Sequence, residues 1–330
     1  MKISRRQFAA AAGLSLLPLL GCARGVMGGA EDFPAQTIRW IVPFPAAGSI
    51  DGVARVVARK MGEILGQQII IDNRAGAGGR VGAKLVADAR PDGYTQLFTL
   101  NTTYTIDKAL FKNLAYDPDR AFEPVSIIAE TSEMLVVSPT LKVKDLRAFM
   151  ALMKAHPREY NYASSGVGGS LHLAMLYFQS LTGLELVHVP YKGGPPAVTD
   201  LMTGRVAAMF LNTPAASPYI RNHQIQALGV STKSRSPYMP DIPTIAEAGV
   251  PGFDISVWFG LSVPAGTPRS VIDKMHDAVV KALEDPGVRK ELANIGADPV
   301  GDTPGEFAAR KDAESAKWTK VFKENHITLE

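Results

Sequence analysis

Short apolar runs alternate with amphipathic stretches along most of this chain, and this alternation restricts the possible fold more than any other feature of the sequence. The first apolar runs are residues 38–42, 68–72 and 95–100. Residues 78–89 form an amphipathic stretch, and behind the first run apolar residues recur at helical spacing, namely Val53, Val56, Val57, Met61, Ile64 and Leu65. Strands that alternate with helices are typical of a parallel sheet covered by helices.

A second unit of the same kind lies inside the first. Its expected strands are 160–163, 186–189 and 207–211, and its expected helices are 146–153, 170–182 and 195–202. Two apolar segments, 127–137 and 255–263, are expected to cross between the units, and three helices follow at 268–283, 286–295 and 304–323. Thr303 and Glu306 have the spacing of a capping box at the start of the last helix.

These elements predict an α/β fold of two lobes, each a doubly wound sheet, hinged by two crossing strands. Lobe 1 comprises residues 31–131 together with 256–330, and lobe 2 comprises residues 132–255. A pair of hinge strands allows two lobes to close around a ligand.

The first 30 residues have the pattern of an export signal. Residues 4–8 (SRRQF) place a twin arginine ahead of the apolar stretch 9–20, as in signals of the twin-arginine route. This stretch is too short for a permanent membrane-spanning helix. Cys22 follows Leu-Leu-Gly and resembles a lipoprotein processing site, and the alternative is cleavage near Ala30, which would discard it. We therefore expect a periplasmic protein and leave lipid anchoring through Cys22 open.

The charge balance argues against nucleic acid as a partner. The formal net charge is +3, but residues 1–30 hold four basic and no acidic side chains, so the remaining chain lies near −1. Nucleic-acid-binding domains are strongly basic. Because Cys22 is the single cysteine, no intrachain disulfide can form.

Three loops join the carboxyl end of an expected strand to a helix and are rich in small residues and hydrogen-bond donors. They are residues 44–51 (FPAAGSID), 163–172 (ASSGVGGSLH) and 190–195 (PYKGGP). Open α/β sheets bind ligands at this edge. The first turn of a helix has unpaired N–H groups and the positive end of the helix dipole, so it can hold a carboxylate without an arginine. Glycine-rich turns that only reverse the chain are the alternative.

Individual side chains in these loops each have two interpretations. Asp51 would repel an anion, so capping the helix or holding a water competes with direct contact. Lys192 neutralises the ligand or is solvated, Tyr191 covers the ligand or packs in the core, and His172 is either structural or a ligand contact. Asn212, which follows the strand 207–211, is placed to donate from the opposite wall.

The sequence lacks the patterns of common catalytic sites. The six histidines have no metal-ligand spacing, and there is no HExxH, CxxC or GxSxG motif. Residues 166–171 (GVGGSL) approach a dinucleotide fingerprint, but Leu171 stands where the third small residue belongs. We therefore expect no enzyme activity and no metal or other cofactor.

Several longer segments resemble the periplasmic receptors of tripartite tricarboxylate transporters, also called the Bug or TctC family. The similar segments are residues 71–95, 161–174, 188–210, 235–253 and 258–268. The resemblance implies a two-lobed, periplasmic-binding-protein-like fold of type II, without catalytic activity or cofactor. It implies that the three loops bind the carboxylate of an amino-acid, di- or tricarboxylate or aromatic acid, partly through water, and that a two-protein membrane permease is the partner.

The predicted ligand site combines the loop residues, which bind the carboxylate, with side chains that would contact the part of the ligand beyond the carboxylate. Thr103 is a further candidate beside Thr102, and Thr213 is a further candidate beside Asn212. The predicted set is Phe44, Ala47, Gly48, Ser49, Asp51, Thr102, Ser164, Ser165, Gly168, Gly169, Ser170, His172, Tyr191, Lys192, Gly193 and Asn212. Ala47 departs from the family, whose members often have a second glycine there, and alanine narrows the backbone freedom of the loop.

Two other functions stay open at this level. The first is a carboxylate-sensing protein that serves a signalling partner, because a sensor would use the same closed, liganded cleft. The second is an exported nucleotide-dependent oxidoreductase, which the interrupted fingerprint disfavours. A monomer is expected in either case.

Overall fold

The N-terminal alternation forms a six-stranded sheet in the computed structural model, which describes residues 33–324 apart from positions 47, 112 and 192. The three predicted strands of this region are parallel neighbours, and a strand from later in the chain lies beside them and runs antiparallel to them. In order across the sheet the strands are β11 (Asp298–Pro299), β4 (Phe122–Thr131), β10 (Val257–Pro264), β3 (Thr95–Leu100), β1 (Ile38–Val42) and β2 (Ile69–Asn73).

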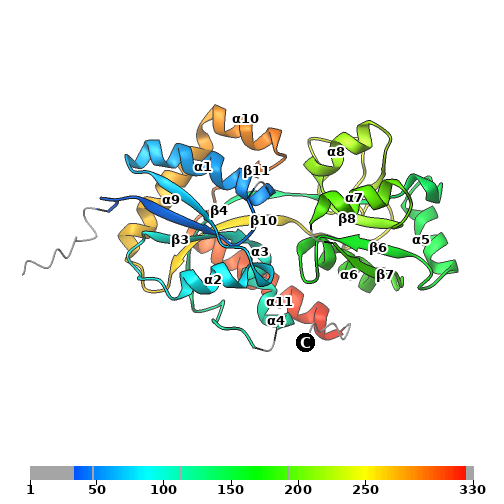
Figure 1. Ribbon diagram of the computed structural model, residues 1–330, viewed down its shortest axis with the longest axis horizontal. Coiled ribbons are helices and arrows are strands. Elements are labelled where there is room, and N and C mark those ends of the chain that lie inside the picture. Colours follow the sequence, from blue (N-terminus) through cyan, green and yellow to red (C-terminus); the bar gives the residue numbers. More distant parts are fainter. Residues whose placement is uncertain (1–32, 47, 112, 192, 325–330) are drawn as a thin grey trace, which may run out of the picture.

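The second unit forms a separate five-stranded sheet beside the first (Figure 1). In order across the sheet its strands are β7 (Val187–Pro190), β6 (Asn161–Ser164), β8 (Ala208–Asn212), β5 (Glu133–Val137) and β9 (Gln226–Val230). β6, β7 and β8 are parallel, whereas β5 is antiparallel to β8 and β9. The predicted fold class, a two-lobed mixed α/β protein, is confirmed.

Helices cover both sheets. The helices with the first sheet are α1 (Ser49–Leu65), α2 (Arg80–Ala87), α3 (Asn101–Thr105), α4 (Asp107–Leu110), α9 (Arg269–Glu284), α10 (Pro286–Asn294) and α11 (Pro304–Glu324). The helices with the second are α5 (Leu146–Ala155), α6 (Ser170–Thr182), α7 (Gly194–Met202) and α8 (Thr213–Arg221). None of the helices in the described part of the chain is both long and apolar enough to cross a membrane.

Both faces of the first sheet are buried along β1 and β10, which explains why these strands are almost entirely apolar. Successive side chains of β1 point to opposite faces, so Trp40 joins the cluster under α1 and α9, whereas Ile41 joins the cluster around Tyr104 and Trp258. The Trp40 ring stacks on Phe98 with ring centroids 5.2 Å apart.

The chain passes between the two sheets twice. One predicted crossing strand, 127–137, is two strands: β4 ends at Thr131 and β5 begins at Glu133. The break occurs because β4 pairs with β10 in the first sheet, whereas Glu133 pairs with Asn212 in the second. The second crossing leads into β10, where Val257 lies opposite Thr131, so the two connections are neighbours. This arrangement supports lobe boundaries near residues 131 and 256, which we retain as a proposal.

Helix α11 contacts both lobes. Its start has the predicted capping box, in which the Thr303 N–H donates to Glu306 Oε2 (2.9 Å) and the Glu306 N–H donates to Thr303 Oγ1 (3.2 Å). Phe307 packs in the core of the first lobe. Trp318 and Phe322 instead belong to the hydrophobic cluster of the second lobe, a contact that the sequence pattern does not indicate.

Candidate functional site

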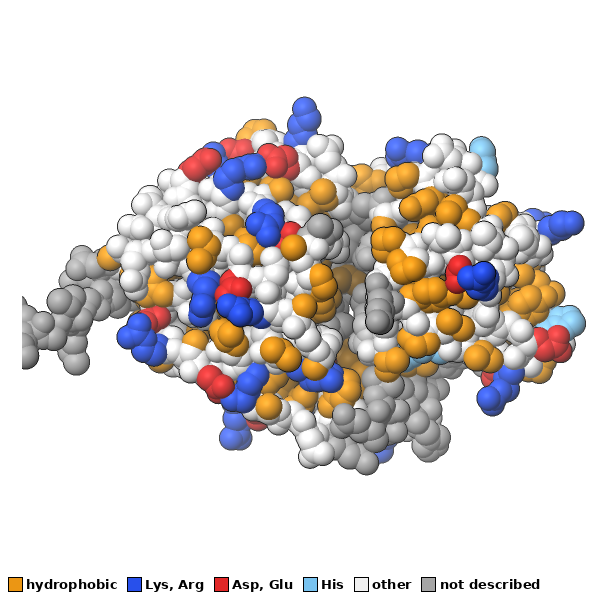
Figure 2. All heavy atoms as spheres, viewed as in Figure 1, with side chains coloured by type: hydrophobic (Ala, Val, Ile, Leu, Met, Phe, Trp, Pro, Cys, Tyr) orange, Lys and Arg blue, Asp and Glu red, His pale blue; other side chains and the backbone are white. Residues whose placement is uncertain are grey.

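The parallel strands of both sheets end at the edge where the chain crosses between the lobes. In the first sheet, β10 is antiparallel to β3 and starts at Val257, opposite Thr131. In the second, Glu133 lies opposite Asn212 at the end of β8, which is parallel to β6. The described residues of the loops that follow these strands therefore line one interlobe furrow, together with the helix starts at 101 and 213. These loop residues are 43–46, 48, 74–79, 165–169, 191 and 193. Figure 2 shows this furrow as a hollow between the two halves of the molecule.

The first loop leads into α1 at an open helix start. Gly48 is the N-cap residue, with extended backbone (φ −81°, ψ 170°) and no side-chain cap. Gly48 and Ser49 are exposed. The first turn of α1 thus begins without a side-chain cap, as the predicted anion site requires. Ala47 lies outside the described residues, so its effect on the pocket stays a prediction.

Asp51 is buried and holds this loop in place. Its carboxylate accepts hydrogen bonds from Arg55 Nε (2.9 Å), Arg55 Nη2 (3.0 Å) and Asn73 Nδ2 (3.0 Å). Asn73 Nδ2 also donates to the Phe44 carbonyl (3.1 Å). Of the two interpretations of Asp51, these contacts favour a supporting role over a direct contact with the ligand.

The second loop presents two serine hydroxyls and the start of α6. Ser164 is buried, and its hydroxyl donates to the Gly166 carbonyl (3.1 Å) and lies 2.7 Å from His188 Nε2. Ser165 is exposed, and Ser170, the first residue of α6, is half-buried. Gly169 is the N-cap and has no side-chain cap. Ser165 and Ser170 are therefore the hydroxyls best placed to bind a ligand.

A stacked histidine pair supports this loop from within the lobe. His172 Nδ1 accepts a hydrogen bond from the Gly168 N–H (3.1 Å), and the His172 and His188 ring centroids are 4.0 Å apart. The His188 ring also stacks on Tyr162. Burial, aided by the charge on His188, lowers the pKa of His172 to about 4. A neutral His172 can accept the Gly168 hydrogen bond. Of the two interpretations of His172, this contact favours a structural role over contact with the ligand.

This pKa predicts that the histidine pair destabilises the protein in acid. The pKa is 6.5 in the unfolded chain and about 4 in the folded one, so between these values the unfolded state binds more protons and stability falls as the pH falls. Urea unfolding at pH 7 and pH 4.5 should show that wild type loses roughly 2 kcal/mol more than His172→Gln.

The matched control for this prediction is His223→Asn, at an exposed turn residue with φ 55°, a conformation that asparagine tolerates. This control should follow wild type at both pH values. Equal pH dependence in wild type and His172→Gln would contradict the role of the buried pair.

The third loop is anchored by Tyr191. Its N–H donates to the Ser164 carbonyl (3.0 Å) and its hydroxyl donates to Asp200 Oδ2 on α7 (2.7 Å). Because the hydroxyl is committed to Asp200, Tyr191 fixes the loop, and its ring packs against the core of the lobe. Gly193 is the N-cap of α7, with φ 103°, a conformation that favours glycine. Lys192 lies outside the described residues.

The first lobe contributes the residues that surround Thr103. A Cβ added to Gly79 would lie 3.2 Å from Phe44 Cζ and 3.5 Å from Thr103 Oγ1, so these three residues are neighbours. Thr103 Oγ1 is 2.9 Å from Thr99 Oγ1, and both Thr102 and Thr103 are buried. On the other lobe, Asn212 is half-buried at the end of β8, and its side chain makes no capping hydrogen bond to the start of α8.

Helix starts at the furrow differ from several of those elsewhere. Among the described residues, α1, α2, α3, α6, α7 and α8 all begin there without a side-chain hydrogen bond to the first turn. By contrast, Asp145 caps α5, Asp285 caps α10 and Thr303 caps α11, away from the furrow. Uncapped first turns leave N–H donors that an anion can satisfy. The starts of α7 and α8 offer fewer of them, because each contains proline, which has no N–H, and the Thr213 N–H already donates to the Ser132 carbonyl.

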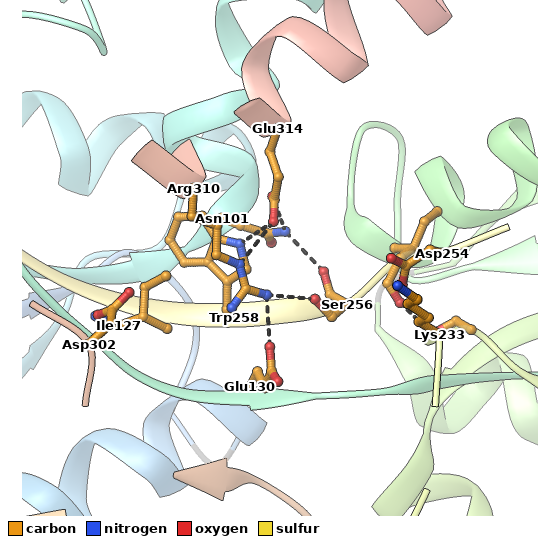
Figure 3. Close-up of polar contacts among 12 residues, drawn as sticks. Asn101, Ile127, Glu130, Lys233, Asp254, Ser256, Trp258, Asp302, Arg310 and Glu314 are labelled. Carbon is orange, nitrogen blue, oxygen red and sulfur yellow. Dashed lines mark hydrogen bonds and ion pairs between the residues drawn. The ribbon is translucent and has the colours of Figure 1, made fainter. Parts of the chain in front are cut away.

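A polar cluster ties α11 to the two connections between the lobes (Figure 3). Arg310 Nη2 donates to Glu130 Oε2 on β4 (2.7 Å) and to Ser256 Oγ, just before β10 (2.9 Å). Glu314 Oε1 accepts from Trp258 Nε1 (2.7 Å). One helix therefore holds both connections at the base of the furrow.

Three features of the furrow were not predicted as site residues. Gly79 follows a glycine-rich turn after β2, a signal of the kind that selected the other loops. Glu133 is a lone acid at the head of an apolar strand. Arg310 gives no local signal, because its partners Glu130 and Ser256 lie 180 and 54 residues away. Among residues 33–324 that the structure describes, no group of three or more His, Cys, Asp or Glu could hold a metal ion.

Comparison with known proteins identifies the family. The model of the tripartite tricarboxylate transporter family receptor matches residues 53–327. The chain belongs to this family. Protein BugT from Bordetella pertussis is 37% identical over 301 residues, which cover 91% of this chain and 92% of BugT.

Two solved structures of similar proteins hold dicarboxylates. Rpa4515 from R. palustris with adipate is 35% identical, with a TM-score of 0.83 over 90% of this chain and 100% of the other. MatC (Rpa3494) from Rhodopseudomonas palustris with bound malate is 35% identical, with a TM-score of 0.79 over 88% of this chain and 99% of the other. Family members are periplasmic binding proteins, that is, receptors, and carboxylates are the ligands of both structures.

Proposed function

We propose that this receptor captures a small carboxylate anion in the interlobe furrow and delivers it to a two-protein membrane permease of the tripartite tricarboxylate type. The observation that carries the proposal is the set of six helix starts that open onto the furrow without side-chain caps. Such starts bind anions through backbone N–H groups and the helix dipole. The adipate and malate of the two similar proteins fit this chemistry.

In this proposal, the carboxylate lies between the loop with Gly48 and Ser49 on one lobe and the loop with Ser165 and Ser170 on the other. Asp51 and the hydroxyl of Tyr191 position these loops. Amino-acid, di- or tricarboxylate and aromatic acids are the candidate cargo. The twin-arginine-type signal would deliver the protein to the periplasm, with the lipidation of Cys22 open; both lie outside the described residues.

A thermal-shift screen against mono-, di- and tricarboxylates, aromatic acids and NAD(P) tests this function. A ligand at about 100 times its dissociation constant stabilises the folded state by about 2.7 kcal/mol. We expect a clear rise in Tm with at least one carboxylate and none with the nucleotides. Stabilisation by a nucleotide alone would contradict the proposal.

Uptake separates transport from sensing. Cells that lack this protein should fail to accumulate the radiolabelled acid that the screen identifies, and expression of the protein should restore accumulation. Normal uptake without the protein, despite tight binding in solution, would favour the sensing alternative.

A further inference from the structure

Glu133 is a buried acid at the furrow that the proposed site does not use. It is the first residue of β5, directly after the crossing between the lobes. Its side chain is fully buried, and neither carboxyl oxygen has a hydrogen-bond partner among the described residues. Buried polar groups are nearly always hydrogen-bonded, so an acid left without a partner at the edge of a ligand site requires a functional explanation.

The surroundings of this carboxyl group favour its neutral form. Ser170, the first residue of α6, lies beside the Glu133 carboxyl group, and no nearby cation stabilises the ionised form of that group. The Glu133 N–H donates to Ser231 Oγ (2.9 Å), and Asn212 lies opposite on β8. Burial raises the pKa of Glu133 to about 7, an effect that Ser170 partly opposes. A carboxyl group in such a place keeps its proton below about pH 7 and can then donate a hydrogen bond.

The state of Glu133 determines what the Ser170 hydroxyl can do. A serine hydroxyl has one proton to donate and two lone pairs. If Glu133 is neutral, it donates to Ser170 Oγ, and Ser170 can give its own proton to a carboxylate in front of α6. If Glu133 is ionised, Ser170 donates to Glu133 instead, so that lone pairs and a nearby negative charge face the ligand.

We propose that Glu133 is a positioning residue: its neutral carboxylic acid turns the Ser170 hydroxyl toward the bound carboxylate, so that an anion binds only when Glu133 is protonated. This inference rests on the proposed function of the furrow. Ser170 lies close enough to Glu133 to influence its pKa, but outside hydrogen-bond geometry, so we expect the ligand to complete the hydrogen bond by orienting the hydroxyl.

The other titratable groups around Glu133 do not account for such a pH dependence. On α6 and β7 these are His172 and His188, and burial lowers the pKa of both, so they stay neutral above pH 6.5. On the connecting strand before Glu133, Glu130 is paired with Arg310. Beyond Ser231, which accepts the hydrogen bond of the Glu133 N–H, lies Asp254, and its carboxylate accepts a hydrogen bond from the Lys233 N–H.

Calorimetric titration with acetate, malate, adipate, citrate and aspartate at pH 6.5 and pH 8.5 tests the inference. With a pKa of about 7, the protonated fraction falls strongly between these values, so Kd for wild type should rise by at least about tenfold. Glu133→Gln, whose amide can donate to Ser170 at any pH, should bind with nearly the wild-type affinity of pH 6.5 at both values. Ser170→Ala should weaken binding at pH 6.5 and reduce the pH dependence.

Each result has a distinct meaning. If none of the five acids binds at either pH, both the proposed function and this inference are wrong. Binding that is equally tight at both pH values in wild type overturns the inference alone. Tighter binding of aspartate at pH 8.5 also overturns it, because that result would mean that ionised Glu133 binds the ammonium group of aspartate directly. If Glu133→Gln does not fold, the wild-type profile and Ser170→Ala still decide the question.

Discussion

Gly169→Leu should lose carboxylate binding by at least about a hundredfold, equivalent to about 2.7 kcal/mol, and still fold. Gly169 is the N-cap of α6 with φ −73°, a conformation open to any residue. An added Cβ would meet only the Gly166 carbonyl and Ser165 Oγ, both at 3.6 Å, so the backbone tolerates the change. The rest of the leucine side chain must occupy the space in front of the N–H groups of α6. Calorimetry with the acid found by the thermal-shift screen measures the loss.

Gly305→Leu is the matched control for this prediction. Gly305 is the second residue of α11, it is exposed, and an added Cβ would meet no atom within 4 Å. This variant should bind the same acid with wild-type affinity. A folded Gly169→Leu protein with unchanged affinity would exclude the second loop as the carboxylate site.

Trp318→Ala should lower the free energy of unfolding by about 3–5 kcal/mol, the usual loss for a buried tryptophan. Trp318 is 4% exposed and belongs to the hydrophobic cluster of the second lobe, although most of α11 packs on the first. Its ring contacts Tyr177 and Phe322, with centroids 5.7 and 5.5 Å away. Truncation therefore opens a cavity and removes a contact between the lobes. Urea unfolding followed by circular dichroism gives the free energy.

Lys320→Ala on the same helix is the control, because the Lys320 side chain is 74% exposed. It should change the free energy of unfolding by less than about 0.5 kcal/mol. A loss below about 1 kcal/mol for Trp318→Ala would mean that the end of α11 does not hold the lobes together.

Most of the fold could be predicted from local patterns. Predicted strands 38–42 and 95–100 and helix 170–182 coincide with β1, β3 and α6. The sequence patterns do not predict α3, α4, α8, β9 or the two-residue strand β11. α8 contains Pro214 and Pro218 and begins directly after β8, so its sequence resembles a turn more than a helix. β9 is a short strand at the edge of its sheet, and its sequence QALGV lacks a clear alternation.

The candidate site could be predicted only in part. The three loops were chosen because each joins a strand end to a helix, and the structure places them along one furrow. The direction of individual side chains could not be read in the same way. Asp51 turns to Arg55 and Asn73, and the Tyr191 hydroxyl turns to Asp200, because these contacts depend on how strands and helices pack.

The sequence by itself determined the alternation of strands and helices, the apolar faces that bury both sheets, the capping box of α11 and the family. These features depend on residues close together in the chain, or on patterns that recur along it. Only the tertiary structure decided that α11 holds the two connections through Arg310 and contacts the second lobe through Trp318, and that Glu133 lies near Ser170. Burial and charge pairing of this kind arise between residues tens to hundreds of positions apart, so they exist only once the chain has packed.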